Sequence, residues 1–260
     1  MEYFEFSREA NYVVGASSLP VEWYEGQPIP IESRVHLGYG NSAAEYLDSG
    51  VRDVNTILQI LARCGAPVPD GATILDFGCG GGRMLRHLPT ALPGGQYWGC
   101  DTESKAIAWA QVYLGEAFRM FTNLREPRLP FADASIDFVF AGSVFSHLND
   151  MAEFWMLELR RTVRPGGVLY LTFQDDSSLS FIRAKGTARA RYYYDNLFVA
   201  NDAERFFTGD YQRVVVGQDK YSSQVFYRTT WLEKLLRQYF SRVTLVPNGY
   251  GWQTAAVLHP

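Results

Sequence analysis

Short apolar runs alternate along the chain with stretches whose apolar residues recur every three or four positions. The short runs, bounded by glycine, proline or acidic residues, predict buried strands. The periodic stretches predict amphipathic helices, the first of them over 51–63, ended by Gly65 and Pro67. The strands are expected near residues 73–77, 96–100, 117–122, 136–140, 168–173, 243–246 and 252–258. The intervening helices are expected over 83–91, after Thr102, after Asp150 and after Thr230.

This alternation of strand and helix predicts an α/β fold with a doubly wound, mostly parallel seven-stranded sheet. Asn248-Gly249 indicates a short turn between the last two strands, and two strands joined by a short turn must be antiparallel. The last strand is therefore expected to run against the others. A segment over 174–228 follows the fifth strand and is longer than a plain connection requires.

Composition narrows the classes of protein. The chain has 260 residues, 47% of them hydrophobic, which suits a sizeable core, and a formal net charge of −4. An acidic balance argues against nucleic acid or an anionic membrane as a partner. No apolar run approaches a membrane span, and Met1–Glu5 lacks the basic start of a secretory signal. A cytoplasmic location is expected.

Three cysteines, Cys64, Cys79 and Cys100, form no C-x-x-C pair. Two of them lie in or beside predicted strands, so we expect buried free thiols and a reducing compartment. We predict no metal site.

The most informative stretch is Thr73 to Arg83, in which a short apolar run leads to Asp76 and then to glycines at 78, 80, 81 and 82. This is the layout of a strand, a tight turn and a helix N-terminus, whose unpaired N–H groups favour an anionic group. A dinucleotide fingerprint beginning at Gly78 requires a third glycine where Arg83 stands. A nicotinamide or flavin cofactor is therefore disfavoured.

An acid follows at the end of the second strand, since Asp101 lies 19 residues beyond Gly82. A carboxylate at about this distance can accept hydrogen bonds from both hydroxyls of a ribose. The competing interpretation makes Asp101 part of a helix cap, with Thr102 as the N-cap residue.

The pattern Asp76-x-Gly78-x-Gly80-x-Gly82 resembles the first motif of class I S-adenosylmethionine (SAM) dependent methyltransferases, which have a Rossmann-like fold. The segments Leu129–Phe140 and Leu159–Gly167 resemble later elements of that family, and the resemblance runs from about Val51 to Pro260. It implies SAM as cofactor, S-adenosylhomocysteine (SAH) as product, and in-line displacement of the methyl group by an acceptor.

The resemblance also implies site residues. Asp76 and the turn residues Gly78, Cys79, Gly80, Gly82 and Arg83 are expected at the amino-acid end of the cofactor, and Asp101 and Thr102 at its ribose. Asn123 and Leu124 are expected at the adenine, although many members carry Asp where Asn123 stands, and a plain turn role stays open. Ser143, Val144 and His147 should face the reactive methyl group. His147 is the candidate general base, or else a structural residue bonded to backbone.

We expect an irregular N-terminal or lid segment over 1–50 and a methyltransferase domain over 51–260. Residues 174–228 combine aromatic and basic side chains, which suits either an accessory core or a substrate lid. The acceptor is predicted to be a small molecule, methylated on oxygen. The alternatives are a methyltransferase that acts on RNA or protein and a non-catalytic SAM-binding protein.

Overall fold

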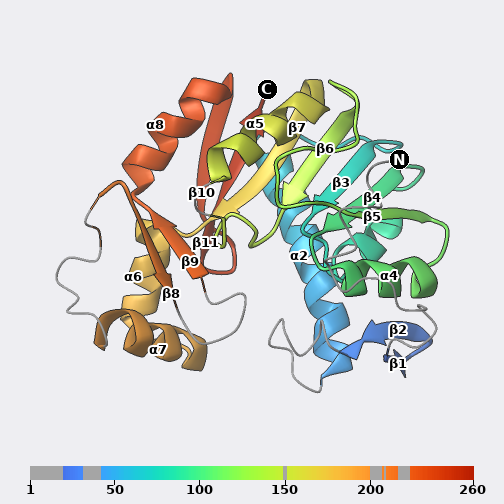
Figure 1. Cartoon of the computed structure of the whole chain (residues 1–260), viewed down its shortest axis with the longest axis horizontal. Coiled ribbons are helices and arrows are strands. Elements are labelled where there is room, and N and C mark those ends of the chain that lie inside the picture. Colours follow the sequence, from blue (N-terminus) through green and yellow to red (C-terminus); the bar gives the residue numbers. More distant parts are fainter. Residues whose placement is uncertain (1–19, 32–41, 149–150, 200–206, 208, 216–222) are drawn as a thin grey trace.

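The computed structural model describes residues 20–31, 42–148, 151–199, 207, 209–215 and 223–260. Its main feature is a seven-stranded sheet in which only β11 runs antiparallel to its neighbours (Figure 1). The predicted fold class is thus confirmed, with the last strand inserted in an otherwise parallel sheet. Across the sheet the order is β10 (Arg242–Tyr250), β11 (Gln253–His259), β7 (Val163–Phe173), β6 (Ile136–Ala141), β3 (Thr73–Phe77), β4 (Gln96–Asp101) and β5 (Phe118–Thr122).

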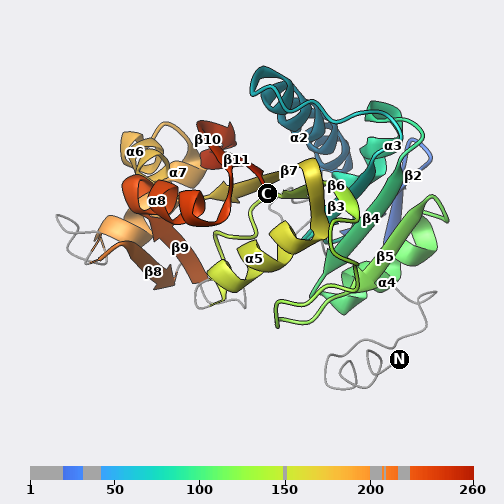
Figure 2. The ribbon, with the colours of Figure 1, turned by 90° about the horizontal axis from the view of Figure 1, so that it is seen from above.

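Helices cover both faces of the sheet, and Figure 2 shows α2 and α5 on opposite sides of it. One face packs against α2 (Ala43–Arg63), the short helices η4 (Leu85–His87) and α3 (Leu88–Ala91), and α4 (Ser104–Tyr113). The other face packs against α5 (Ala152–Thr162) and α8 (Thr229–Tyr239). Strands buried on both faces explain why β3 and β6 read as apolar runs and not as alternating patterns.

The N-terminal part departs from the expected irregular segment. A hairpin of β1 (Val21–Tyr24) and β2 (Gln27–Pro30) lies there, and α2 begins eight residues before the predicted position 51. The Ser42 side chain caps α2 by accepting from the N–H of Glu45. Gly50 lies within the helix, and the position requires glycine because a Cβ there would come within 2.4 Å of the Arg83 carbonyl oxygen.

Three other local predictions are wrong. The expected helix over 83–91 is divided into η4 and α3. Glu103, not Thr102, occupies the N-cap position of α4. The helix predicted to start at Thr230 has Arg228 as its N-cap residue. The N–H of Thr229, in its first turn, donates to the Asp176 carboxylate. The predicted cap at Asp150 lies outside the described residues.

The turn predicted at Asn248-Gly249 is also wrong. Strand β10 continues to Tyr250, and its pairing with β11 is irregular between Val246 and Tyr250. Asn248 has φ +55°, which suits a bulge as well as a turn, so the chain reverses only after Tyr250.

The described residues of the segment 174–228 form a lobe at the end of the molecule away from α4 (Figure 1). It contains α6 (Asp176–Ala184), α7 (Ala188–Tyr194), a π-helical turn at Asp195–Val199, and an antiparallel pair, β8 (Tyr211–Val215) and β9 (Ser223–Tyr227). A small core of its own includes Leu179, Ile182, Leu197, Phe198 and Phe226. Strand β9 attaches this lobe to the sheet, because Val225 N–H donates to Ser146 and Tyr227 N–H to Gln174.

Candidate cofactor site at the carboxyl edge of the sheet

The parallel strands β3, β4, β5, β6 and β7 end at one edge of the sheet, and the predicted site residues follow these ends. The glycine turn after β3 bends toward β4, where the N–H groups of Gly78 and Cys79 both donate to the Cys100 carbonyl (2.8 and 3.0 Å). Gly78 has φ +82°, and a Cβ there would lie 2.3 Å from Cγ2 of Val144. The turn therefore lies between the end of β4 and the loop after β6.

Two other glycines of the turn differ in what surrounds them. Gly82 has φ +77°, and a Cβ would meet Leu114 at 2.5 Å, so this glycine allows the turn to pack on α4. Gly80 has φ +52°, and among the described residues no atom lies within 4 Å of the corresponding position. Glycine at this position thus leaves the space beside the turn open, so a ligand can approach the backbone there.

The Asp101 carboxylate connects the second strand end to the glycine turn. Its Oδ2 accepts from the N–H of Gly80 and its Oδ1 from the N–H of Glu103, both at 2.8 Å. Asp101 thus orders the chain just before α4, whose N-cap position is held by Glu103, and Thr102 is exposed. A carboxylate has about four acceptor positions, so both oxygens can also accept from ribose hydroxyls.

The third strand end carries Asn123, which is buried. Its backbone N–H donates to the Asp101 carbonyl (3.1 Å), which places it beside the second strand end. Its side-chain Nδ2 donates to the Leu124 carbonyl at 2.8 Å. Because this contact engages the NH₂ group of the amide, Oδ1 is the atom that can accept from the amino group of a purine.

Asp76 is the most unusual group of the site. It is 1% exposed, and neither carboxylate oxygen accepts a well-formed hydrogen bond among the described residues, with the Leu85 backbone N–H acting on it only weakly. Burial raises the pKa of Asp76 to about 8, although the nearby Arg83 guanidinium opposes the rise. A buried carboxyl without partners needs an explanation, and a cationic amino group bound nearby would favour its charged form. The Asp76 carboxyl, the Asp101 oxygens and the open space at Gly80 therefore fit the expected cofactor.

Two predicted residues, Cys79 and Arg83, are largely buried. The Cys79 side chain is buried in the core below the turn, and burial raises the pKa of its thiol. Its carbonyl accepts from the Gly82 N–H at 2.9 Å. Cys79 thus shapes the turn from within the protein.

Arg83 is 7% exposed and is held by side chains from two distant elements. It donates to Ser49 Oγ (3.0 Å) and to an Asp53 carboxylate oxygen (2.6 Å), both on α2, and to the Tyr250 hydroxyl (2.7 Å) on β10. Arg83 therefore joins the glycine turn to α2 and to the C-terminal hairpin.

The loop after β6 brings Ser143, Val144 and His147 to the same edge. Ser143 has φ +61°, a strained conformation for a residue with a side chain. Its N–H donates to Thr172 Oγ1 (2.7 Å), and its Oγ accepts from Gln253 Nε2 (2.8 Å). This side-chain network holds the strained loop.

The partly buried His147 ring lies against β9 of the inserted lobe. Its Nδ1 is 2.8 Å from the Ser223 carbonyl oxygen. A carbonyl oxygen only accepts, and this contact is shorter than that between Gln224 Nε2 and the same Nδ1 (3.5 Å), so it favours the tautomer with the hydrogen on Nδ1 and the lone pair on Nε2. The backbone bond anticipated for a structural histidine is present, and it also sets the tautomer that a base requires.

Sequence reasoning missed Thr172, Gln253 and Tyr250 in this region. A polar Thr172 between Leu171 and Phe173 in a buried strand was the one available signal. The other two come from the C-terminal hairpin, and their contacts with Ser143 and Arg83 join residues far apart in the sequence.

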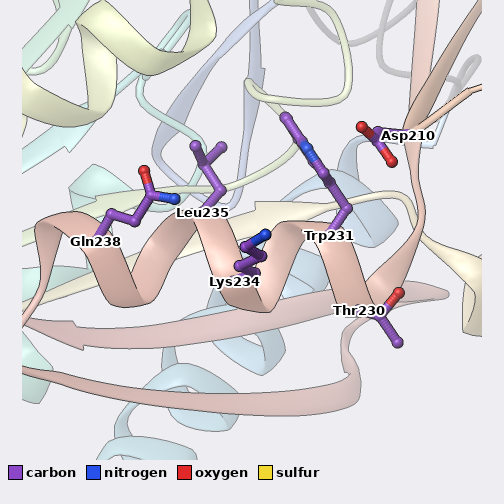
Figure 3. A pocket seen from close by; sticks show the side chains of 6 residues that line it. All are labelled: Asp210, Thr230, Trp231, Lys234, Leu235 and Gln238. Atoms are coloured by element: carbon purple, nitrogen blue, oxygen red, sulfur yellow. The ribbon is translucent and has the colours of Figure 1, made fainter.

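A surface hollow of about 420 Å³ lies elsewhere, along α8 (Figure 3). Its lining residues are Asp210, Thr230, Trp231, Lys234, Leu235 and Gln238. None of them is a predicted site residue, and α8 covers a face of the sheet and not its carboxyl edge. We assign this hollow no role in cofactor binding.

The described part of the chain contains no group of three or more potential metal-ligating side chains, and its three cysteines are free. Within the same residues, no helix combines the length and apolar character needed to span a bilayer.

Comparison with known proteins places this geometry in context. Residues 75–171 match a family described as "Methyltransferase domain". The chain is 32% identical over 127 residues to a trans-aconitate 2-methyltransferase of Azoarcus sp. strain BH72, which is 48% of this chain and 47% of that protein. It is 30% identical over 140 residues to a malonyl-[acyl-carrier protein] O-methyltransferase of Hahella chejuensis, which is 53% of this chain and 48% of that protein. The chain thus spans about half the length of these curated relatives.

Solved structures have the same fold. Magnesium protoporphyrin IX methyltransferase from Synechocystis PCC 6803, with bound SAH, superposes with a TM-score of 0.54 at 17% identity, covering 88% of this chain and 94% of that one. The PH0226 protein from Pyrococcus horikoshii gives a TM-score of 0.59 at 19% identity, covering 85% and 92%.

Proposed function

Because residues 75–171 belong to the methyltransferase family and the sheet has its class I fold, we propose that this chain methylates an oxygen atom of a small-molecule acceptor with SAM as cofactor. The family expected from the sequence is confirmed by the matched domain. Transfer by this chain, its acceptor class and the roles of its residues belong to the proposal. A cytoplasmic location stays a prediction.

The observation that carries the proposal is the alignment of three strand ends. The glycine turn follows β3, Asp101 ends β4 and Asn123 follows β5, and these strands are neighbours in the sheet. The Gly80 N–H donates to the Asp101 carboxylate, so the open space beside the glycine turn adjoins an acceptor for the next part of a ligand. This order suits a ligand with an amino-acid end, a ribose and a purine base.

In this proposal each residue has one task. Asp101 accepts from the ribose hydroxyls, and Asn123 Oδ1 accepts from the adenine amine while the Leu124 backbone lines the base. The turn at 78–82 leaves open space at Gly80 for the amino-acid end, and the bound amino group favours the charged form of Asp76. Bound SAM supplies a methyl group activated by a sulfonium sulfur. The strand ends hold this group still against the acceptor, which is the main source of rate in well-oriented systems.

His147 is the proposed base. With Nδ1–H bound to the Ser223 carbonyl, Nε2 is the ring atom that can take a proton from an acceptor hydroxyl. Because Ser223 belongs to β9, the inserted lobe sets the orientation of the ring. The lobe thus has a role on the acceptor side of the site.

Support for a small acceptor comes from relatives whose names specify O-methylation or a small acid. These include the malonyl-[acyl-carrier protein] enzyme of Hahella chejuensis and the trans-aconitate enzyme of Azoarcus. The basic side chains of the inserted lobe also argue against RNA as the acceptor. Arg183, Lys185 and Arg189 lie over Phe198, Tyr194 and Trp252, so the lobe's own aromatic rings and the hairpin engage these cations.

The test is a transfer assay with a panel of acceptors. The purified chain is incubated with SAM and with small carboxylic acids, phenols or amines, and both SAH and the methylated product are measured by mass spectrometry. We expect SAH to form with an oxygen acceptor and not with the amines. Binding of SAM without product from any acceptor would favour a non-catalytic protein, and uptake of NAD in place of SAM would overturn the proposal.

A further inference from the structure

The connection between β10 and β11 carries two aromatic residues that contact different parts of the molecule. Tyr250 is the last residue of β10 and pairs with Gln253 across the turn. The irregular pairing before Tyr250, with Asn248 at φ +55°, directs this end of the hairpin toward the carboxyl edge of the sheet.

Tyr250 lies beside the segments that follow the ends of β3 and β6. Its hydroxyl accepts from Arg83 Nη2 at 2.7 Å and lies 3.8 Å from the Met84 sulfur, both in the segment that follows the glycine turn. A Cβ on Gly142, just after β6, would lie 2.9 Å from Cζ of Tyr250. The phenol ring therefore covers the end of β6 while its hydroxyl contacts Arg83.

The order of the strands decides which part of the cofactor lies there. If Asn123 after β5 takes the base and Asp101 at β4 takes the ribose, the ligand continues toward β3 and β6. The amino-acid end then lies at the gap between these two strands, next to Arg83 and Tyr250.

Trp252 anchors the hairpin from the other side. Its ring lies 4.9 Å from that of Tyr193 and 5.7 Å from that of Phe181, and the Arg189 guanidinium lies 5.1 Å from its centroid. These three residues belong to α6 and α7 of the inserted lobe. Packing against the lobe limits the movement of the hairpin end that carries Tyr250.

We propose that Tyr250 is a positioning residue for the amino-acid end of SAM and acts by orienting the Arg83 guanidinium. This inference rests on the proposed function. Asp53 and Tyr250 both accept from the Nη2 group of Arg83, so loss of the hydroxyl removes the contact that orients the guanidinium from the side of the hairpin. A guanidinium has a fixed planar fork, and a change in its orientation alters what it offers to a carboxylate.

The test compares SAM with 5′-methylthioadenosine, which keeps the adenosine and the methylated sulfur but lacks the amino-acid end and, with it, the sulfonium charge. Tyr250→Phe keeps the ring and removes only the hydroxyl. We expect the Kd for SAM to rise about tenfold, while the Kd for 5′-methylthioadenosine stays within about twofold of wild type. Both constants are measured by calorimetry.

Tyr97→Phe is the matched control. The Tyr97 hydroxyl also makes buried hydrogen bonds, to the Leu92 carbonyl and from the Gly95 N–H, but at the amino end of the sheet. This control should bind both ligands as wild type does. Gly142→Ala is a second variant, since its methyl group displaces the Tyr250 ring without removing the hydroxyl, and we expect the same selective loss of SAM.

Equal weakening of both ligands by Tyr250→Phe, or no weakening of either, would overturn the inference and leave the proposed function intact. Wild-type protein that binds neither ligand would overturn the proposed function and this inference with it.

Discussion

The Asp101 carboxylate accepts a hydrogen bond of 2.8 Å from the backbone N–H of Gly80. Two motifs separated in the sequence thus meet in one contact at the carboxyl edge of the sheet. The turn is the place for the charged end of a ligand, and the acid is the place for its sugar. Most of the proposed site is arranged around this contact.

Replacement of Asp101 by Asn should weaken SAM binding strongly. Hydrogen bonds to a charged group contribute about 1.5–3 kcal/mol each, so we expect the Kd for SAM, measured by calorimetry, to rise at least about tenfold. Asp176→Asn is the control, because that carboxylate also accepts a backbone N–H, from Thr229, but belongs to the lobe. Equal affinity in Asp101→Asn and wild type would leave Asp101 as a helix cap only.

The open space at Gly80 makes a second prediction. Gly80→Ala places a methyl group where the ligand should lie. Because the ligand must shift to avoid this methyl group and loses contacts in doing so, we expect the Kd for SAM to rise at least about tenfold. Gly115→Ala controls for backbone strain, since Gly115 also has a positive φ (+82°) and open surroundings. Both variants should lose about 1 kcal/mol of stability. Unchanged SAM affinity in Gly80→Ala would mean that the ligand does not approach this turn.

Asp76 predicts an unusual dependence of stability on pH. Its pKa is about 8 in the folded protein and lies near 4 in an unfolded chain, so folding takes up a proton between these values. The cost of burying this acid therefore grows as the pH rises from 4 to 8. Asp76→Asn does not titrate and should gain stability relative to wild type over this range.

The slope for one such group is at most about 1.4 kcal/mol per pH unit. The measurement is denaturant unfolding of wild type and Asp76→Asn without ligand at pH 5, 6.5 and 8. Asp70→Asn, which removes an exposed carboxylate, controls for net charge. A stability difference between wild type and Asp76→Asn that stays constant with pH would show that the buried carboxyl does not retain its proton.

His147 should affect turnover more than cofactor binding. With an acceptor found in the panel, His147→Gln should lower kcat about 10²–10⁴-fold and leave the Kd for SAM within about twofold. His259→Gln is the matched control, since His259 Nδ1 also contacts a carbonyl oxygen, that of Gly167 (3.2 Å), at the opposite edge of the sheet. Full activity of His147→Gln would make His147 a structural residue.

The sequence could predict the strands of the sheet because Ile74 and Leu75, or Phe138 to Phe140, form apolar runs that only a doubly covered sheet explains. It could predict Asp101 because the distance from Gly82 is fixed by one helix and one strand. It could not fix the start of α2, since the apolar residues whose spacing predicts this helix, from Val54 to Leu61, lie only in its second half. Asn248-Gly249 reads as a turn because a positive φ suits a turn and a bulge equally.

The contacts around Arg83 had no local signature. The hydrogen bond between Arg83 and Tyr250 spans 167 positions and depends on how the last hairpin packs against the first turn. Likewise, the contact of His147 with Ser223 depends on the fold of the inserted lobe. Motif spacing predicts residues on neighbouring strand ends, but not side chains that reach the site from separate elements.

A crystal structure with SAH bound is the most direct test of the proposed site. The account predicts adenine beside Asn123, ribose hydroxyls within hydrogen-bond distance of Asp101, and the amino-acid end next to the glycine turn, Arg83 and Tyr250. SAH bound elsewhere, or bound with its ribose away from Asp101, would contradict it.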